Sequence, residues 1–199
     1  MPELLFREEG HTYVLDGVVL PSVSDLCAPL HNAAYADVPK WKLEAAAERG
    51  TATHLATCAL DAGCAAEVDD SCLPYVRAYA KFLTEHKASW SLTEAPMYHP
   101  EHLYAGTPDR YGILDGCNAL VDVKTTYTVQ KPLCRAQLNL YRLILMARGL
   151  PVDKMFILHL KPDESYKLIP FSVDEPLALA LITIRNALPK RRKKGVTHV

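Results

Sequence analysis

The sequence predicts an α/β (α+β) fold in which a central mixed β-sheet is flanked by helices. Between residues 39 and 90 the chain is rich in Ala, Leu, Glu and Lys, or repeats apolar residues every three or four positions, as helices do. From residue 91 onwards it changes to alternating and β-branched segments around one amphipathic helical segment. Helices that precede and interrupt a set of strands are expected to cover the faces of one sheet.

A hairpin and a helical region are predicted at the N-terminus. The segment HTYVLDGVVLPSVSDL alternates around Asp16 and Gly17, a dipeptide suited to a two-residue turn. Pro21 and Ser22 then open a polar segment of the kind that starts a helix. We therefore expect two short strands followed by an N-terminal helical elaboration of the sheet.

Two helices are predicted before the sheet. The first runs from about Pro39 and has Gly63 as a C-terminal cap, with Gly50 either a close-packing point or the joint between two helices. The second is CLPYVRAYAKFLTEHKASW, whose apolar residues recur at helical spacing.

The remaining elements are strands around one helix. The expected strands are SLTEAPMYH, AGTPDRYGIL, NALVDVKTT and MFILHLKP. The helix LCRAQLNLYRLILMARG lies before the last of these strands and ends at Gly149. A final helix, EPLALALITIRNALPK, leads into KRRKK, which predicts a solvated, mobile basic tail over residues 190–199.

Length and composition indicate one domain spanning residues 1–199. With 199 residues, 49% of them hydrophobic, the chain can bury a core. The net charge of -1 means that affinity for nucleic acid must come from local clusters of basic residues. Neither an export signal nor a long apolar run is present, which predicts a cytoplasmic protein. The six cysteines include no C-x-x-C pair, so we expect reduced thiols and no structural zinc site.

Charged residues follow one face of a predicted strand. Side chains two positions apart share a face, so Leu120, Asp122 and Lys124 point one way and Val121 and Val123 point the other. The valines are expected in the core. The charges then meet whatever covers the opposite face.

The same hairpin is a candidate metal site. If the preceding strand pairs antiparallel, Asp109 lies beside Asp122. Two carboxylates about 4 Å apart repel by roughly 4 kcal/mol at an effective dielectric constant near 20, and a divalent cation would offset this repulsion. Lys124 would then orient or deprotonate a water molecule, or balance charge on a phosphorane-like transition state. The alternative is an exposed Asp122–Lys124 ion pair on an edge strand, which is the commoner reading of D-x-K alone.

Four motifs in this order resemble the PD-(D/E)xK nuclease superfamily. They are G-x-x-x-H at residues 50–54, G-x-x-D at 106–109, D-x-K at 122–124 and Q-x-x-x-Y at 137–141. The resemblance is to the branch that contains the nuclease domain of RecB, CRISPR-associated exonucleases, the mitochondrial genome maintenance exonuclease and phage exonucleases. It implies a restriction-endonuclease-like core, and it extends over residues 40–145.

The resemblance implies a role for each motif residue. His54, Asp109 and Asp122 would bind the metal, helped by the main-chain carbonyl of Val123, and Lys124 would be the catalytic lysine. An imidazole ligand favours Mn²⁺ over Mg²⁺. A lone helical histidine can instead be a hydrogen-bonded core residue.

Further residues are expected at the edges of this site. Glu94 precedes G-x-x-D, where many relatives carry an acidic catalytic residue, although an exposed strand glutamate explains it nearly as well. The residues expected to contact DNA are Gln137, Tyr141, Thr125, Thr126, Arg110 and Arg135. For the Q-x-x-x-Y pair and the two threonines, the alternative is that they support the site.

The resemblance also implies an activity. We expect a metal-dependent deoxyribonuclease, an exonuclease that acts on linear DNA and leaves 5′-phosphates, in phage or bacterial recombination and repair. The alternatives are a structure-selective or restriction-type endonuclease and an inactive DNA-end-binding accessory protein. A single-strand annealing or single-strand-binding protein is the expected partner, and no feature specifies an oligomer. Relatives with an iron–sulfur cluster carry three C-terminal cysteines, and because no cysteine follows Cys134 no cluster is expected.

Overall fold

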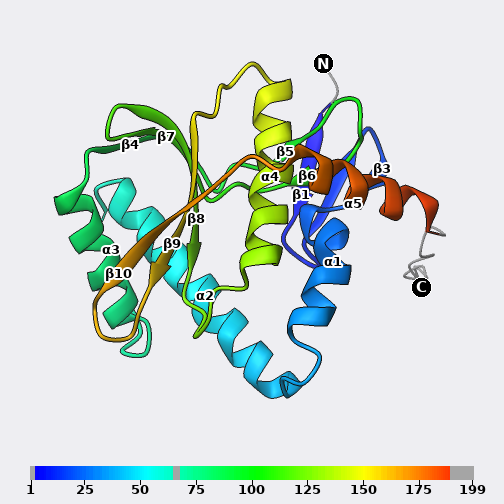
Figure 1. Ribbon diagram of the computed structural model, residues 1–199. Coiled ribbons are helices and arrows are strands. Elements are labelled where there is room, and N and C mark those ends of the chain that lie inside the picture. Colours follow the sequence, from blue (N-terminus) through cyan, green and yellow to red (C-terminus); the bar gives the residue numbers. More distant parts are fainter. Residues whose placement is uncertain (1–2, 65–67, 189–199) are drawn as a thin grey trace, which may run out of the picture.

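The computed structural model describes residues 3–64 and 68–188 (Figure 1). The predicted basic tail lies outside these residues. The strands are β1 (Leu4–Arg7), β2 (Thr12–Leu15), β3 (Val18–Leu20), β4 (Ala88–Thr93), β5 (Met97–Tyr98), β6 (Ala105–Gly106), β7 (Arg110–Leu114), β8 (Cys117–Lys124), β9 (Lys154–Leu160) and β10 (Tyr166–Phe171). The helices are α1 (Val23–Ala34), α2 (Lys40–Asp61), α3 (Leu73–Glu85), α4 (Lys131–Ala147) and α5 (Glu175–Ala187). No helix within the described residues is both long and apolar enough to cross a membrane.

A mixed sheet of five strands forms the centre of the fold. Its order is β10-β9-β8-β7-β4, with β8 and β9 parallel and the other neighbours antiparallel. A parallel pair needs a crossover, and α4 provides it between β8 and β9. The predicted fold class, a mixed central sheet flanked by helices, is therefore confirmed. The edge strand β10 was missed by the sequence analysis.

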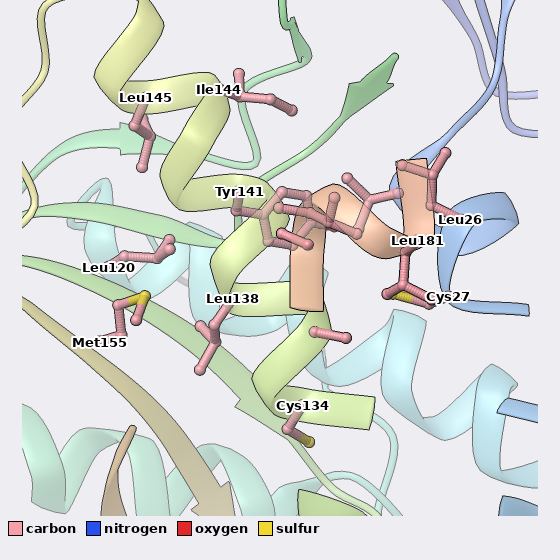
Figure 2. Packing of buried hydrophobic residues seen from close by; sticks show 14 of the residues in the cluster. Leu26, Cys27, Leu120, Cys134, Leu138, Tyr141, Ile144, Leu145, Met155 and Leu181 are labelled. Atoms are coloured by element: carbon pink, nitrogen blue, oxygen red, sulfur yellow. The ribbon is translucent and has the colours of Figure 1, made fainter. Parts of the chain in front are cut away.

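Helices cover both faces of this sheet (Figure 1). On one face a buried apolar cluster joins residues of α1, α4 and α5 to β8 and β9, and Figure 2 shows part of it around Leu138 and Tyr141. On the other face a second cluster joins α3 to β7, β8 and β9, with Leu60 of α2 packed against it. The site described below lies where β8 emerges between these two layers.

The two faces of β8 follow the alternation expected from the sequence. Leu120 belongs to the cluster beneath α4, whereas Val121 and Val123 belong to the cluster beneath α3. Asp122 and Lys124 therefore point to the α4 side. β8 is a central strand, so the predicted alternative of an exposed ion pair on an edge strand is wrong.

The N-terminal region is a small sheet followed by helices. Asp16 and Gly17 both have positive φ angles, 48° and 82°, which confirms the predicted two-residue hairpin between β2 and β3. Strand β1 adds a third strand to the expected two. Ser22 caps α1 through a capping box with Asp25, as its position before the helix predicts.

Helix α2 is continuous through Gly50 and ends just before Gly63, whose φ is +68°. A Cβ atom added at Gly50 would lie 3.9 Å from Thr125 Oγ1, which is ordinary van der Waals contact. Gly50 is therefore not a joint between helices. It marks where α2 passes the end of β8.

Candidate metal and phosphodiester site

The hairpin of β7 and β8 brings two carboxylates to one place. Arg110 pairs with Val121 at the end of the register, so the next positions, Asp109 and Asp122, lie side by side as expected. Asp109 Oδ2 accepts a hydrogen bond of 2.7 Å from the Val123 amide. The Asp109 and Asp122 residues are 6% and 0% exposed. Both acids are therefore held in a site with little water.

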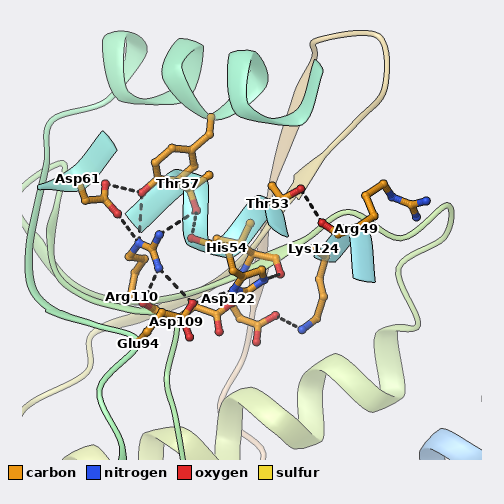
Figure 3. Close-up of polar contacts among 12 residues, drawn as sticks. Arg49, Thr53, His54, Thr57, Asp61, Glu94, Asp109, Arg110, Asp122 and Lys124 are labelled. Carbon is orange, nitrogen blue, oxygen red and sulfur yellow. Dashed lines mark hydrogen bonds and ion pairs between the residues drawn. The ribbon is translucent and has the colours of Figure 1, made fainter. Parts of the chain in front are cut away.

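Helix α2 adds a histidine and the segment after β4 adds a third acid. His54 Nδ1 lies 2.7 Å from Glu94 Oε1 and 3.7 Å from Asp109 Oδ2. One ligand atom from each of these three residues lies within 4.8 Å of the other two, a spacing that one metal ion could bridge (Figure 3). The His54 Nε2 atom faces the Val123 carbonyl at 3.2 Å, so the predicted carbonyl is also at the site.

The His54 ring is strongly influenced by the acids around it. Burial alone would lower the pKa of His54, but Asp109 and Glu94 outweigh burial and raise the pKa to about 9. At neutral pH the ring is therefore protonated when no metal is bound. A cation at this site would have to displace that proton.

Asp122 and Lys124 form a pair at the edge of this group. Their Oδ2 and Nζ atoms are 2.6 Å apart (Figure 3). Burial raises the pKa of Asp122 to about 6, against the opposing effect of Lys124 and with a further rise from Asp109. Burial would lower the pKa of Lys124, but Asp122 and Asp109 reverse this and raise it. Lys124 therefore stays charged at neutral pH, which favours charge stabilisation over proton abstraction.

The donor set fits a divalent cation. Asp122 Oδ1 is buried and has no hydrogen-bond partner within residues 3–64 and 68–188. An unpartnered buried carboxylate oxygen is costly, and a cation or its bound water would satisfy it. His54, Glu94 and Asp109 lie close by, so the groups available to a cation here are one imidazole and three carboxylates, a set that suits Mg²⁺ or Mn²⁺.

The position of Glu94 differs from the expected one. It follows β4 instead of lying on it, and its φ angle is +45°, a region that non-glycine residues seldom adopt. Its amide donates to the Asp109 carbonyl at 2.9 Å. This turn directs the carboxylate to His54, so the alternative of a simply exposed strand glutamate is wrong. In the structure Glu94, not Asp122, completes the compact group with His54 and Asp109.

Arg110 does not lie where a DNA contact requires. Its side chain is 0% exposed and pairs with Asp61. The prediction of a DNA-binding role is therefore wrong: Arg110 follows Asp109 directly, so it points to the opposite face of β7, toward α2 and α3. Its position and the role of Asp61 were not foreseen, because only the fold brings the last turn of α2 to this strand.

The Q-x-x-x-Y pair lies on α4 behind the acids. Tyr141 is buried and hydrogen bonds with Gln137. Its ring packs so closely on Gly106 that a Cβ atom there would lie 2.6 Å from Tyr141 Cε1. Tyr141 is therefore buried in the core behind the acids, whereas Gln137 is partly exposed.

The remaining predicted DNA contacts are divided between the site and the surface. Thr125 is buried and its carbonyl accepts a 3.4 Å hydrogen bond from Arg49. Thr126 is partly exposed and donates to the Thr128 carbonyl at 3.1 Å. Arg135 is exposed and faces α5, where Asp174 lies 3.7 Å from its guanidinium. Only Thr126 of these adjoins the cleft described next.

A cleft of about 290 Å³ leads away from Lys124 between α1, α2 and α4. Among residues 3–64 and 68–188, no carboxylate lines it. Its lining combines apolar and polar side chains: Val23, Ser24, Cys27, His31, Tyr35, Leu43, Ala46, Ala47, Lys124, Thr126, Gln130, Leu133, Cys134 and Gln137. The contribution of α1 was not foreseen, since nothing in its sequence indicates that it packs against α4.

The chain shows only limited similarity to known proteins. No family model and no curated protein matches the chain. One similar solved structure is the alkaline exonuclease LHK-Exo from Laribacter hongkongensis, with 16% sequence identity, a TM-score of 0.44, and coverage of 83% of this chain and 84% of that chain. Another is SSO0001, with 14% identity, a TM-score of 0.44, and coverage of 85% and 76%. At this level of similarity the function has to be inferred from the site itself.

Proposed function

We propose that this protein is a metal-dependent deoxyribonuclease whose single domain hydrolyses phosphodiester bonds. The observation that carries the proposal is the convergence of three motifs at one place. His54 from α2, Asp109 before β7, and the Asp122–Lys124 pair of β8 surround a common space, although they are spread over seventy residues of sequence. Tyr141 of the fourth motif packs directly behind them.

The acids and the histidine would hold the cation. His54, Glu94 and Asp109 supply ligand atoms at bridging distance, and Asp122 supplies the unpartnered oxygen beside them. A bound Mg²⁺ or Mn²⁺ would supply Lewis acidity and lower the pKa of a water molecule. The Val123 amide fixes Asp109 through one oxygen. The pairing of β7 and β8 holds Asp109 beside Asp122, whereas His54 is held by α2 and Glu94 by its backbone contact with Asp109.

Lys124 would stabilise negative charge at the phosphate. Its ammonium group is positively charged and borders both Asp122 and the cleft. A preformed positive charge in a site with little water stabilises charge that develops in the transition state. None of the described residues that line the cleft is a carboxylate, which suits a DNA strand that approaches along it, where Thr126, Gln130 and Gln137 offer hydrogen bonds.

The type of cleavage and the biological role are proposed from the resemblance of the four motifs to the PD-(D/E)xK nuclease superfamily. We place the protein among exonucleases that act on linear DNA and leave 5′-phosphates, in the cytoplasm during phage or bacterial recombination and repair. A single-strand annealing or single-strand-binding protein is the proposed partner. Arg135, on the exposed face of α4, is a candidate phosphate contact once DNA competes with Asp174.

The test compares end-labelled linear DNA with closed circular DNA in Mn²⁺, Mg²⁺ or EDTA. Asp122→Asn removes one buried charge with little change of shape, and Asp70→Asn makes the same chemical change at an exposed position. We expect metal-dependent loss of linear DNA alone, retained in Asp70→Asn and lost in Asp122→Asn. Cleavage of circles would establish an endonuclease. Binding of DNA without cleavage in any metal would establish an accessory protein.

A further inference from the structure

We propose that Arg110 is a positioning residue that holds His54, Glu94 and Asp109 in the arrangement that binds the metal. This role rests on the metal site of the proposed nuclease. Arg110 is fully buried and would not meet DNA. Its guanidinium contacts each of the three metal-binding residues directly or through one intermediate.

Two of the contacts reach the metal-binding residues directly. Arg110 Nη1 donates to the Asp109 carbonyl at 2.8 Å and lies 3.4 Å from Glu94 Oε1 (Figure 3). The same Glu94 oxygen lies 2.7 Å from His54 Nδ1. Arg110 therefore fixes the backbone that carries one acid and the rotamer of the other.

The third contact runs through Thr57 on α2. Arg110 Nη2 donates to Thr57 Oγ1 at 3.0 Å, and the Thr57 hydroxyl donates to the His54 carbonyl at 3.0 Å. Thr57 is fully buried and lies one helical turn after His54. This relay connects the guanidinium to the backbone of the histidine.

The opposite side of the guanidinium is anchored away from the metal site. Arg110 Nε donates to Asp61 Oδ2 at 2.5 Å and lies 3.3 Å from the Tyr79 hydroxyl, which itself donates to Asp61 Oδ1 at 2.7 Å. Because Asp61 is closer to the guanidinium than Glu94 is, Asp61 balances most of the positive charge of Arg110. Glu94, at the longer distance of 3.4 Å, stays available to a cation.

Stability alone gives little reason for this arrangement. A buried ion pair is often replaced by apolar residues of similar volume without loss of stability. A planar guanidinium, in contrast, offers five donors in a fixed fork, and here these donors reach five groups on α2, on α3, in the segment after β4 and at the residue before β7. Residues that orient metal ligands in this way commonly change metal affinity ten- to a hundredfold when they are altered.

The decisive variant is Arg110→Lys, which keeps the charge and loses the fork. We expect its Kd for Mn²⁺, measured on DNA-free protein by electron paramagnetic resonance at one fixed pH, to rise about tenfold or more. Tyr79→Phe is the matched control, because its hydroxyl contacts Arg110 and Asp61 but none of the three metal-binding residues. It should lower Tm in EDTA and leave the Kd within about twofold.

A second variant covers the case in which Arg110→Lys does not fold. Thr57→Val removes the relay to His54 with almost no change of shape, and we expect a several-fold higher Kd for Mn²⁺. A folded Arg110→Lys with the native Kd would overturn the proposal, as would an unchanged Kd in Thr57→Val. A loss of affinity in Tyr79→Phe as large as that in the other two would show that only fold stability is involved.

The same measurements separate this role from the proposed function. If the native protein binds Mn²⁺ and Arg110→Lys binds it weakly, but no DNA is hydrolysed, the nuclease proposal fails and the positioning role stands. If DNA is hydrolysed and Arg110→Lys has the native Kd, the positioning role fails alone. A native protein that binds no Mn²⁺ would overturn both.

Discussion

Binding of a metal ion should release one proton from His54. A histidine ligand must be neutral, whereas the acids around His54 raise its pKa to about 9 in the metal-free protein, so that the ring carries a proton at pH 7. We therefore propose to measure metal binding between pH 6.5 and 8.5. Asp122, with a pKa of about 6, is mostly ionised over the upper part of this range, so its own titration contributes little there.

The size of the effect follows from the pKa of the ring. With a pKa near 9, about 1% of the rings are neutral at pH 7 and about 10% at pH 8. The Kd for Mn²⁺ should therefore fall by about tenfold for each pH unit over most of this interval. The Kd falls as the pH rises because, below the raised pKa of His54, a proton competes with the cation for the ring.

Calorimetric titration with Mn²⁺ in buffers of different ionisation enthalpy measures both the Kd and the number of protons released. We expect close to one proton at pH 7.5, and its loss in His54→Gln. His86→Gln is the matched control, since His86 pairs with Asp115 away from the site. A Kd that does not change between pH 7 and 8.5 in the native protein would refute His54 as a ligand.

Replacing Gly112 or Gly50 by alanine should change the stability of the protein in opposite directions. A Cβ atom at Gly112 would lie 2.7 Å from the Trp90 Cα atom of the neighbouring strand and would also meet the Ser89 carbonyl, so Gly112→Ala should destabilise the sheet by about 1–3 kcal/mol or more in chemical denaturation. A melting curve equal to that of the native protein would contradict this. Gly50→Ala meets only Thr125 at ordinary contact distance, so it should keep metal binding and stabilise α2 by up to about 1 kcal/mol. A tenfold weaker Kd for Mn²⁺ would instead show that the first motif requires glycine.

The parts of the fold that the sequence predicted are those with strong local patterns. The valines of β8 alternate with Asp122 and Lys124, which identified both the strand and its two faces. The Asp16–Gly17 turn and the Ser22 cap are likewise local signals. Strands β1 and β10 were missed because short edge strands carry few alternating residues, and β10 contains a proline, which weakens the strand pattern.

The site was only partly predictable because its geometry depends on contacts between distant segments. The order of the motifs identified His54, Asp109 and Asp122, but not that Glu94 would turn out of its strand toward His54. Arg110 was assigned to DNA on the basis of its charge. Its actual environment is created by α2 and α3, from residues up to 53 positions away, and no local pattern reveals such a partner.

The most direct test of the metal site is anomalous diffraction from crystals grown with Mn²⁺. We expect a manganese peak bonded to His54, Glu94 and Asp109 at about 2 Å, with Asp122 Oδ1 bonded to the ion or to a water molecule that the ion holds. A manganese ion bound elsewhere while these residues keep their ion pairs would contradict it.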